Sequence, residues 1–429
     1  MRIKTLLNKE GITRLQAIII AIIIVVAAVA GVVFYMLSRP PVRDYYKIGV
    51  IAELTGDLAR GGFCVKRGYD MWANTINEKG GITIEGKSYK VELVYYDAKS
   101  DPAEAAKAVE KAVADGCDFL LGPYSSKCTL GGGPVAEKYK IPFVTGSAES
   151  HLIPEQHYKC TFQTCVTTRE TPETIIKCLV QQYKLPIKTV AIIGADDAFS
   201  KSLAESFSDY CKKYGLNVIF FEIYPVAITD LTPVITRVMA LNPDVLINAG
   251  HPSNHVVVIR NSKELKFNPK LFVFHWGVDT ADFLDQLKAD ANYAVGAVMW
   301  SPKSPWKDPL FGSSKEFVDK FVTIYGREPD YSEAACAATG VFIGELLKKY
   351  KLTPPFDDAK RAKMLEALEE FSCETLFGVM KYSTDPAHWH VNIGLVEYLL
   401  TVQIINQKPV IIGPEKSKEA NIVFPKPPW

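Results

Sequence analysis

Short hydrophobic runs alternate with more polar segments from Lys47 onward. The apolar runs are continuous and predict strands at 47–54, 90–97, 118–122, 141–146, 189–194, 217–224, 244–250, 270–277 and 295–300. The segments between them are long enough for helices; in 102–115, Asp101 is placed as an N-cap, Pro102 lies in the first turn and Gly116 follows the end. Continuous apolar strands separated by helices are typical of βαβ units in a parallel sheet that is buried on both faces.

The pattern continues to the end of the chain. A Pro-rich loop after residue 300 leads into predicted helices at 313–325, 332–350 and 358–371, and then into a β-like stretch at 395–405. There are too many strands for one small doubly wound sheet, and no long linker separates two independent halves. We therefore predict an α/β fold with two doubly wound parallel-sheet lobes and more than one crossover between them. Ligands of such folds bind in the cleft at the carboxyl ends of the strands.

A different pattern occupies the N-terminus, where Leu15 to Leu37 is a run of 23 residues without a charge. As a helix it would be about 34 Å long, enough to cross a bilayer core of about 30 Å. Its N-terminal flank is basic, so the positive-inside rule puts that end in the cytoplasm and the body outside. We predict a cytoplasmic leader at 1–14, a single-pass transmembrane signal anchor at 15–37 and a linker at 38–45 that contains Pro40-Pro41.

Three fates of this segment stay open. The helix can be kept as an anchor, or a signal peptidase can cut after Ala28-Val29-Ala30. The third comes from a resemblance: Glu10-Gly11-Ile12-Thr13 resembles the prepilin-type signal of archaeal surface proteins, in which cleavage after Gly11 would leave the helix as the anchor. Two of the three leave a tethered protein.

Charge separates the same two parts of the chain. Residues 1–43 hold six basic side chains and one acidic one, whereas the remaining residues hold 43 basic and 47 acidic side chains, for a net charge of +1 overall. The mildly acidic body argues against a nucleic-acid-binding protein, which would carry a basic patch.

Motifs for catalysis are missing from the sequence. It has no G-x-x-x-x-G-K-[ST], no G-x-G-x-x-G after a strand, no G-x-S-x-G and no H-E-x-x-H. His251 and His255 lie four residues apart and could hold a metal with His275, but no carboxylate or cysteine cluster accompanies them, so a hydrogen-bonding role is favoured. We expect neither an enzyme nor a cofactor.

Nine cysteines raise the question of disulfides in a body that faces the outside. An odd number leaves at least one unpaired if every bond is intramolecular. Cys178 with Cys211, and Cys117 with Cys128, are the candidate pairs.

Three segments, taken in order, identify a family resemblance. IGVIAELTGDLARGG (48–62), VELVYYDAKSDPAEAAKAVEKAVADGCDFLLGPYSS (91–126) and PVAEKYKIPFVTGSAES (134–150) resemble extracytoplasmic solute-binding proteins of branched-chain amino acid ABC transporters. Residues 196–207 and 325–342 keep the register. The resemblance implies a periplasmic-binding-protein type I fold, with two lobes joined by three crossovers. We assign 46–163 plus 298–378 to the first lobe and 164–297 plus 379–429 to the second.

The resemblance also implies a binding site. It places Ser125 and Ser126 where the family hydrogen-bonds a ligand carboxylate, and a helix that begins beside them would favour an anion there. The other implied ligand-binding residues are Arg60 in the loop over the first strand, Ser147, Ala148 and Glu149 on a second contact loop, and Phe199 and His251 from the other lobe.

One position departs from the family pattern. Amino-acid-binding members place an acid after the strand that corresponds to 271–275, to pair with the ligand's ammonium group, and here Trp276 stands there. Asp279 and Glu149 are the candidates to replace that acid. If neither does, a buried ammonium without a partner makes an α-amino acid unfavourable. Tyr124, Phe199 and Trp276 would then suit an apolar, aromatic, amide-bearing or cationic ligand.

These inferences together predict a membrane-tethered receptor. It would capture a small amino acid or related carboxylate or amide between its lobes and deliver it to the permease subunits of an ABC importer. A ligand-sensing ectodomain of a receptor complex is the alternative, although a cytoplasmic segment of about 14 residues leaves no room for a signalling domain. An enzyme acting in the cleft is the third choice.

Overall fold

The computed structural model describes residues 14–38 and 43–429, which belong to two separate units, one ending at Arg43 and the other formed by Asp44–Trp429. The first unit contains helix α1 (Arg14–Ser38), so the predicted helix is confirmed. Within the part of the chain that the structure describes, no helix is both long and apolar enough to cross a membrane. The leader at 1–13, with its prepilin-like signal, and Pro40-Pro41 of the linker lie outside the described residues.

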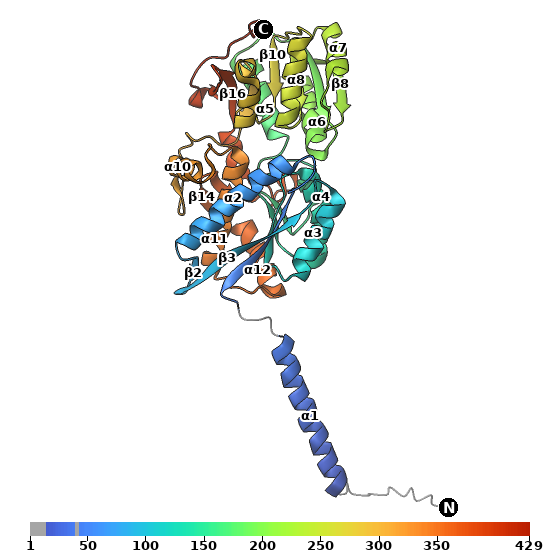
Figure 1. The fold of residues 1–429 in the computed structure, drawn as a ribbon, viewed down its shortest axis with the longest axis vertical. Helices are drawn as coiled ribbons and strands as arrows, with labels where there is room; N and C mark the ends of the chain where they lie inside the picture. The colour runs from blue at the N-terminus through green and yellow to red at the C-terminus, as the bar shows by residue number, and fades with distance from the viewer. Residues whose placement is uncertain (1–13, 39–42) are drawn as a thin grey trace, which may run out of the picture. The chain divides into compact units, whose positions relative to one another are not determined.

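The second unit contains two large sheets (Figure 1), and the first has the order β2-β3-β1-β4-β5-β6. All neighbours in it are parallel except the β2–β3 hairpin. Its strands are β1 (Tyr45–Ala52), β2 (Ile82–Ile84), β3 (Lys87–Asp97), β4 (Phe119–Leu121), β5 (Phe143–Thr145) and β6 (Thr161–Gln163).

The helices of the first lobe come from two distant stretches of the chain. They are α2 (Ala59–Glu78), α3 (Pro102–Ala114) and α4 (Ser126–Tyr139), followed much later by α10 (Ser314–Tyr325), α11 (Tyr331–Tyr350) and α12 (Asp358–Glu370). Helix α11 packs along α2 and is buried over most of its length. The predicted start of α3 is confirmed, because the Asp101 side chain accepts hydrogen bonds from the amides of Ala103 and Glu104.

The second lobe is built on a seven-stranded sheet of order β17-β16-β11-β10-β9-β7-β8. Its strands are β7 (Thr189–Ala195), β8 (Asn217–Tyr224), β9 (Val245–Ala249), β10 (Leu271–Phe274), β11 (Val295–Val298), β16 (Leu400–Ile405) and β17 (Lys408–Gly413). Its helices are α5 (Glu170–Lys177), α6 (Ala198–Lys213), α7 (Thr232–Leu241), α8 (Pro252–Glu264) and α9 (Ala281–Leu287), with a π-helical turn at Cys178–Gln182 and a 3-10 turn at Lys288–Ala291. Strands β16 and β17 are antiparallel to their neighbours, and the others run parallel.

Short elements complete the chain. They are the hairpins β12 (Lys307–Asp308) with β13 (Gly312–Ser313) and β14 (Ser372–Thr375) with β15 (Gly378–Lys381), and the 3-10 turns Pro154–Gln156, Pro386–His388, Ile393–Tyr398 and Glu415–Ser417. The predicted strand at 395–405 is wrong in its first part, which forms a 3-10 turn, and right in its second, which is β16.

The chain passes between the two sheets three times, after β6, after β11 and between β15 and β16. The predicted α/β architecture of two lobes is therefore confirmed. The lobe boundaries remain an assignment of ours, and the one at residue 378 falls inside the β14–β15 hairpin.

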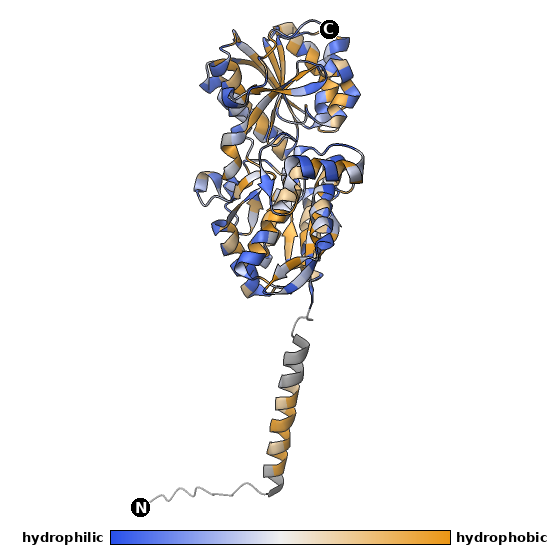
Figure 2. Ribbon diagram, turned by 90° about the vertical axis from the view of Figure 1, so that its left-hand side faces the viewer, coloured by the Kyte–Doolittle hydropathy of each residue, from blue (hydrophilic) through white to orange (hydrophobic). Residues whose placement is uncertain are grey.

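Buried apolar side chains fill both lobes. In Figure 2, hydrophobic colour is concentrated on the central strands, and the helices around them carry both hydrophilic and hydrophobic colour. In β1, Ile48 and Val50 are fully buried, and in β9 the same holds for Leu246 and Ile247. Burial on both faces explains why these strands are continuous apolar runs in the sequence. It also fixes where each strand ends, and so positions the loops that follow.

The proposed disulfides are not present, because all nine cysteines are free. The thiol of Cys178 lies 3.9 Å from the carbonyl oxygen of Ile412, and that of Cys117 lies 3.6 Å from the hydroxyl of Tyr96. Eight of the nine are buried, and seven of these pack in the apolar cores as small apolar side chains; the exception is Cys64, which lines a cavity and is hydrogen-bonded to Arg67.

Candidate functional site

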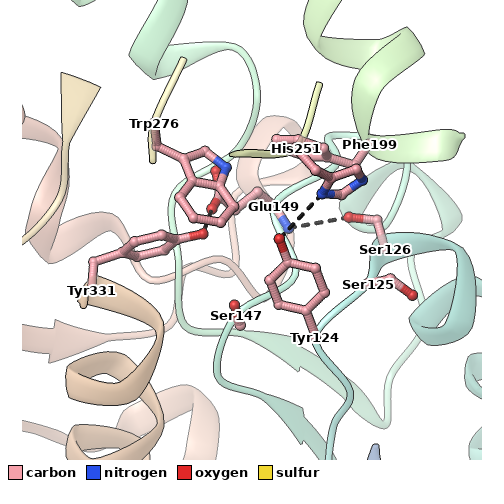
Figure 3. A pocket seen from close by; sticks show the side chains of 9 residues that line it. All are labelled: Tyr124, Ser125, Ser126, Ser147, Glu149, Phe199, His251, Trp276 and Tyr331. Atoms are coloured by element: carbon pink, nitrogen blue, oxygen red, sulfur yellow. Dashed lines mark hydrogen bonds between the residues drawn. The ribbon is translucent and has the colours of Figure 1, made fainter. Parts of the chain in front are cut away.

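The carboxyl ends of strands from both sheets meet around one small cavity (Figure 3). It has an empty volume of about 200 Å³ with its open side included, and its walls are the loops that follow β4, β5, β9 and β10, together with the first turns of α4, α6 and α11. We call it the inner cavity. Its lining residues are Tyr124, Ser125, Ser126, Ser147, Glu149, Phe199, His251, Trp276 and Tyr331.

The loop between β4 and α4 is held by a carboxylate that follows β1, the neighbouring strand in the sheet. Glu53, fully buried just after β1, accepts hydrogen bonds from the amides of Tyr124 and Ser125 at 2.9 Å each, and from the Ser125 hydroxyl at 2.5 Å. The Ser125 oxygen also accepts from the amide of Cys128 and caps α4. The start of this helix, where the resemblance placed a ligand carboxylate, therefore already holds a carboxylate of the protein itself.

Ser126 ties two loops of the first lobe together. Its hydroxyl oxygen accepts hydrogen bonds from the amides of Glu149 and Ser150, at 3.2 and 3.0 Å. Ser147 is bonded to Ser332 at the start of α11, 3.0 Å between the two hydroxyl oxygens. These contacts fix the backbone of the loop after β5 and thereby the position of the Glu149 side chain.

A chain of hydrogen bonds crosses from the first lobe to the second. The Tyr124 hydroxyl lies 3.1 Å from Nδ1 of His251, and Nε2 of His251 lies 3.0 Å from Oδ2 of Asp197. Burial alone would raise the pKa of Asp197, but His251 and the hydrogen bonds from Ser200 outweigh it and lower that pKa to about 2. Asp197 also caps α6 through the amides of Phe199 and Ser200.

Glu149 is the acid that lines the inner cavity. Its Oε1 accepts a hydrogen bond from the Tyr331 hydroxyl at 2.5 Å, whereas its Oε2 is buried without a hydrogen-bond partner in the described structure. Burial raises the pKa of Glu149 to about 8, against the lowering effect of the Tyr331 hydrogen bond. A buried acceptor without a partner costs free energy, so this oxygen is suited to a donor on a ligand.

Two histidines behind the cavity are kept neutral by burial. His275 lies 3.6 Å from Oε2 of Glu149 and is hydrogen-bonded to the Thr171 hydroxyl, and burial lowers its pKa to about 3. His255 bonds through both ring nitrogens, to the Asn248 side chain at 2.8 Å and to the Trp276 carbonyl at 3.1 Å. The role in hydrogen bonding that we favoured over a metal site is therefore what the structure shows for His255, because both of its ring nitrogens are occupied. Burial lowers the pKa of His255 to about 3 as well.

Aromatic rings form much of the remaining wall. The rings of Trp276 and Tyr331 are 4.5 Å apart, and those of Trp276 and Tyr124 are 6.2 Å apart, both edge to face. Phe199 lies against His251 on the opposite side, at 5.4 Å. The indole nitrogen of Trp276 is buried and lacks an acceptor in the described structure. The wall thus offers π faces and one unused donor.

A second hollow adjoins the first and shares Tyr124, His251 and Trp276 with it. We call it the outer cavity; its empty volume is about 500 Å³. Arg60 of α2 forms an ion pair with Asp282 of α9, which closes this region between the two lobes. The close packing of Tyr124 on α2 depends on Gly61, because a Cβ there would lie 2.4 Å from the Tyr124 ring.

Most of the sequence-predicted site residues come together. Of the eleven, eight line the inner cavity: Tyr124, Ser125, Ser126, Ser147, Glu149, Phe199, His251 and Trp276. Arg60 lines the outer cavity. Ala148 is buried beside Glu149 without lining either cavity, and Asp279 lines a larger groove elsewhere. Burial raises the pKa of Asp279 to about 7.

Sequence reasoning missed four residues that shape the site. Glu53 and Tyr331 lie within segments of the family resemblance but were not singled out, and Asp197 is the N-cap next to Phe199. His275 was considered as a metal ligand only. The position of Glu53 and Asp197 directly after strands was the available signal.

Comparisons with known proteins agree with this architecture. Residues 46–397 match the family model described as periplasmic binding protein. The Leu/Ile/Val/Thr-binding protein of Salmonella typhimurium is 26% identical over 54% of this chain and 62% of its own length, and the Leu/Ile/Val-binding protein of Citrobacter freundii is 25% identical over 83% and 91%.

A solved structure shows the same fold. A leucine binding protein from Thermotoga maritima is 20% identical, with a TM-score of 0.72 over 86% of this chain and 98% of its own. Because the family match covers both lobes and all the loops that line the inner cavity, the chain belongs to the periplasmic binding protein family.

Proposed function

We propose that residues 44–429 are the solute-binding receptor of an ABC importer, which captures a small amino acid or related organic ligand between its lobes. The family consists of solute-binding proteins, not enzymes. The observation that carries the proposal is the inner cavity, where loops of both lobes converge on Oε2 of Glu149, a buried acceptor that has no hydrogen-bond partner among the described residues. A donor on a bound ligand would supply the missing hydrogen bond.

Contacts across the cleft support a closing motion as the binding mechanism. Besides Tyr124 with His251 and Arg60 with Asp282, the Ser150 hydroxyl lies 3.0 Å from that of Ser202 on α6. These polar contacts are among those that join the two lobes, in addition to the three chain passages. The closed arrangement would be favoured by a ligand that touches both lobes, and lobe separation would release it.

The receptor is proposed to be tethered to the cell membrane by a single pass, with its body on the extracytoplasmic side. Support comes from the sequence: the 23 uncharged residues Leu15–Leu37 follow a basic flank. The partners would be the permease subunits of the importer. A tether would keep the loaded receptor near its permease.

The experiment is a thermal-shift screen of the purified full chain against amino acids, their amides, carboxylates and amines. A ligand at 100 times its Kd should stabilise the folded state by about 2.7 kcal/mol. Failure of every compound to raise the melting temperature would count against a solute receptor. Deleting the gene should then abolish high-affinity uptake of the stabilising compound; normal uptake with loss of a cellular response would favour the sensing alternative.

A further inference from the structure

We propose that the inner cavity is selective for a small organic cation, an amine with an apolar body, whose ammonium group pairs with Glu149 among the rings of Tyr124, Trp276 and Tyr331. This inference rests on the proposed function and narrows its ligand class. The ligand would thus differ from an anion or a zwitterion, each of which would be bound through its carboxylate. Four features of the site support this inference.

The first part is the acid itself. Glu149 is 2% exposed, and its Oε2 has no hydrogen-bond partner in the described structure. Nε2 of His275 lies 3.6 Å from that oxygen. His275 is fully buried and already bonded to Thr171, so it does not supply a positive charge. No positively charged side chain of the described cavity lining therefore pairs with the Glu149 carboxylate, which leaves it open to a cationic group of a ligand.

The second part is the aromatic wall. The rings of Tyr124 and Tyr331 both lie edge to face against Trp276, and all three side chains border the same cavity as Glu149. Ring faces attract a cation when it is desolvated, by about 2 kcal/mol or more in favourable cases. An acid and several rings around one small cavity form a site for an ammonium group.

The third part is the place where a ligand carboxylate would be expected. The amides of Tyr124 and Ser125 and the Ser125 hydroxyl all donate to the buried carboxylate of Glu53. A second carboxylate at this helix start would meet a like charge and find those donors in use. The only histidine in the cavity lining, His251, is already paired with Asp197.

The fourth part is the approach to the site. The outer cavity is lined by three aspartates and one arginine, and the arginine is paired. The aspartates are Asp57, Asp282 and Asp330. An entrance of this charge attracts cations and repels anions.

Matched probes test the inference. The full chain is titrated by calorimetry with leucine and three analogues: 3-methylbutylamine, which lacks the carboxylate; 4-methylpentanoate, which lacks the ammonium group; and 3-methylbutanamide, which is neutral. We expect the amine to bind at least about tenfold more tightly than each of the others. Equal or tighter binding of leucine or the carboxylate would overturn the inference and leave the receptor function standing. Equal binding of the amide would show that Glu149 acts as a hydrogen-bond acceptor and not as a counter-ion, which also overturns it.

Variants locate the effect. Glu149→Gln should weaken binding of the amine by at least about tenfold and leave the affinity for the amide nearly unchanged. The exposed control Glu110→Gln should change neither affinity. If Glu149→Gln does not fold, Trp276→Leu provides the second variant, and it should weaken the amine more than the amide. Unchanged amine binding in the folded variant would overturn the proposal. If none of the four probes binds in calorimetry, the proposal is overturned too. The receptor function would be contradicted only if no compound of the wider thermal-shift screen raised the melting temperature either.

Discussion

The hydroxyl of Tyr124 lies 3.1 Å from Nδ1 of His251, and this contact joins a loop after β4 in the first lobe to a loop after β9 in the second. Both residues border the inner and the outer cavity. The pair therefore lies between the two cavities, and the contact must break when the lobes part. It offers a direct handle on the balance between open and closed forms.

Replacing this tyrosine should shift that balance. Tyr124→Phe removes the hydroxyl but keeps the ring, so the closed form should lose about 1 kcal/mol and the ligand-free protein should open more often. Small-angle X-ray scattering should show a larger radius of gyration. Tyr214→Phe is the control, because its hydroxyl bonds to Glu173 within the second lobe. Identical scattering from Tyr124→Phe and the wild type would show that the contact does not hold the lobes together.

Glu53 should be a structural residue of the site. Glu53→Gln replaces a charged acceptor of three hydrogen bonds by a neutral amide, which cannot satisfy all three donors of Tyr124 and Ser125. We expect a loss of about 1.5–3 kcal/mol in the free energy of unfolding, measured by urea denaturation. The exposed Glu85→Gln is the control, and it should lie within about 0.5 kcal/mol of the wild type. Equal stability of the two variants would contradict a role for Glu53 in holding this loop.

The fold and much of the site were predictable from the sequence because buried parallel strands leave a simple signal. The apolar run 189–194 predicted β7 (Thr189–Ala195) almost to the residue, and 217–224 coincides with β8. Once the strand ends are known, so is the edge at which ligand-binding loops gather. Phe199 and His251 lie near such strand ends, and the family resemblance singles them out.

What could not be predicted depends on contacts between distant residues. Glu53 accepts a hydrogen bond from Tyr124, which lies 71 residues away in the sequence, and Tyr331 donates one to Glu149, which lies 182 residues away. Local patterns do not say which of many polar side chains will face which. The wrong pairing of Cys178 with Cys211 has the same origin, since lying on successive helices does not make two thiols face each other.

The stability of the ligand-free protein should depend on pH through Glu149. Its pKa is about 8 in the folded protein and 4.5 in the unfolded chain, so between these values the folded state keeps a proton that the unfolded state has lost. Stability from this group is then full below about pH 4.5 and falls as the pH rises toward 8. The Glu149→Gln variant lacks this decline.

The measurement is the melting temperature of wild type minus variant at several pH values from 5 to 8. We expect this difference to fall as the pH rises. The other titratable groups that interact with Glu149 are His275, Tyr331, Tyr124 and Cys165, and they are present in both proteins. Their effects largely cancel in the difference. A difference that stays constant with pH would contradict a raised pKa for Glu149.

Ser126 should act on the ligand through the loop that carries Glu149. Ser126→Ala removes the acceptor of the Glu149 and Ser150 amides, so the loop after β5 loses two of its fixed points. We expect the Kd of the stabilising ligand to rise at least about tenfold, equivalent to about 1.4 kcal/mol.

The control for this variant is Ser206→Ala, another buried serine, whose hydroxyl donates to the Ser202 carbonyl within α6. Both variants should melt within a few degrees of each other, because each loses hydrogen bonds of one buried hydroxyl. Only Ser126→Ala should weaken ligand binding in calorimetry. Equal affinities in the two variants would mean that Glu149 keeps its position without Ser126, and that other contacts, such as the hydrogen bond between Ser147 and Ser332, are enough to fix the loop after β5.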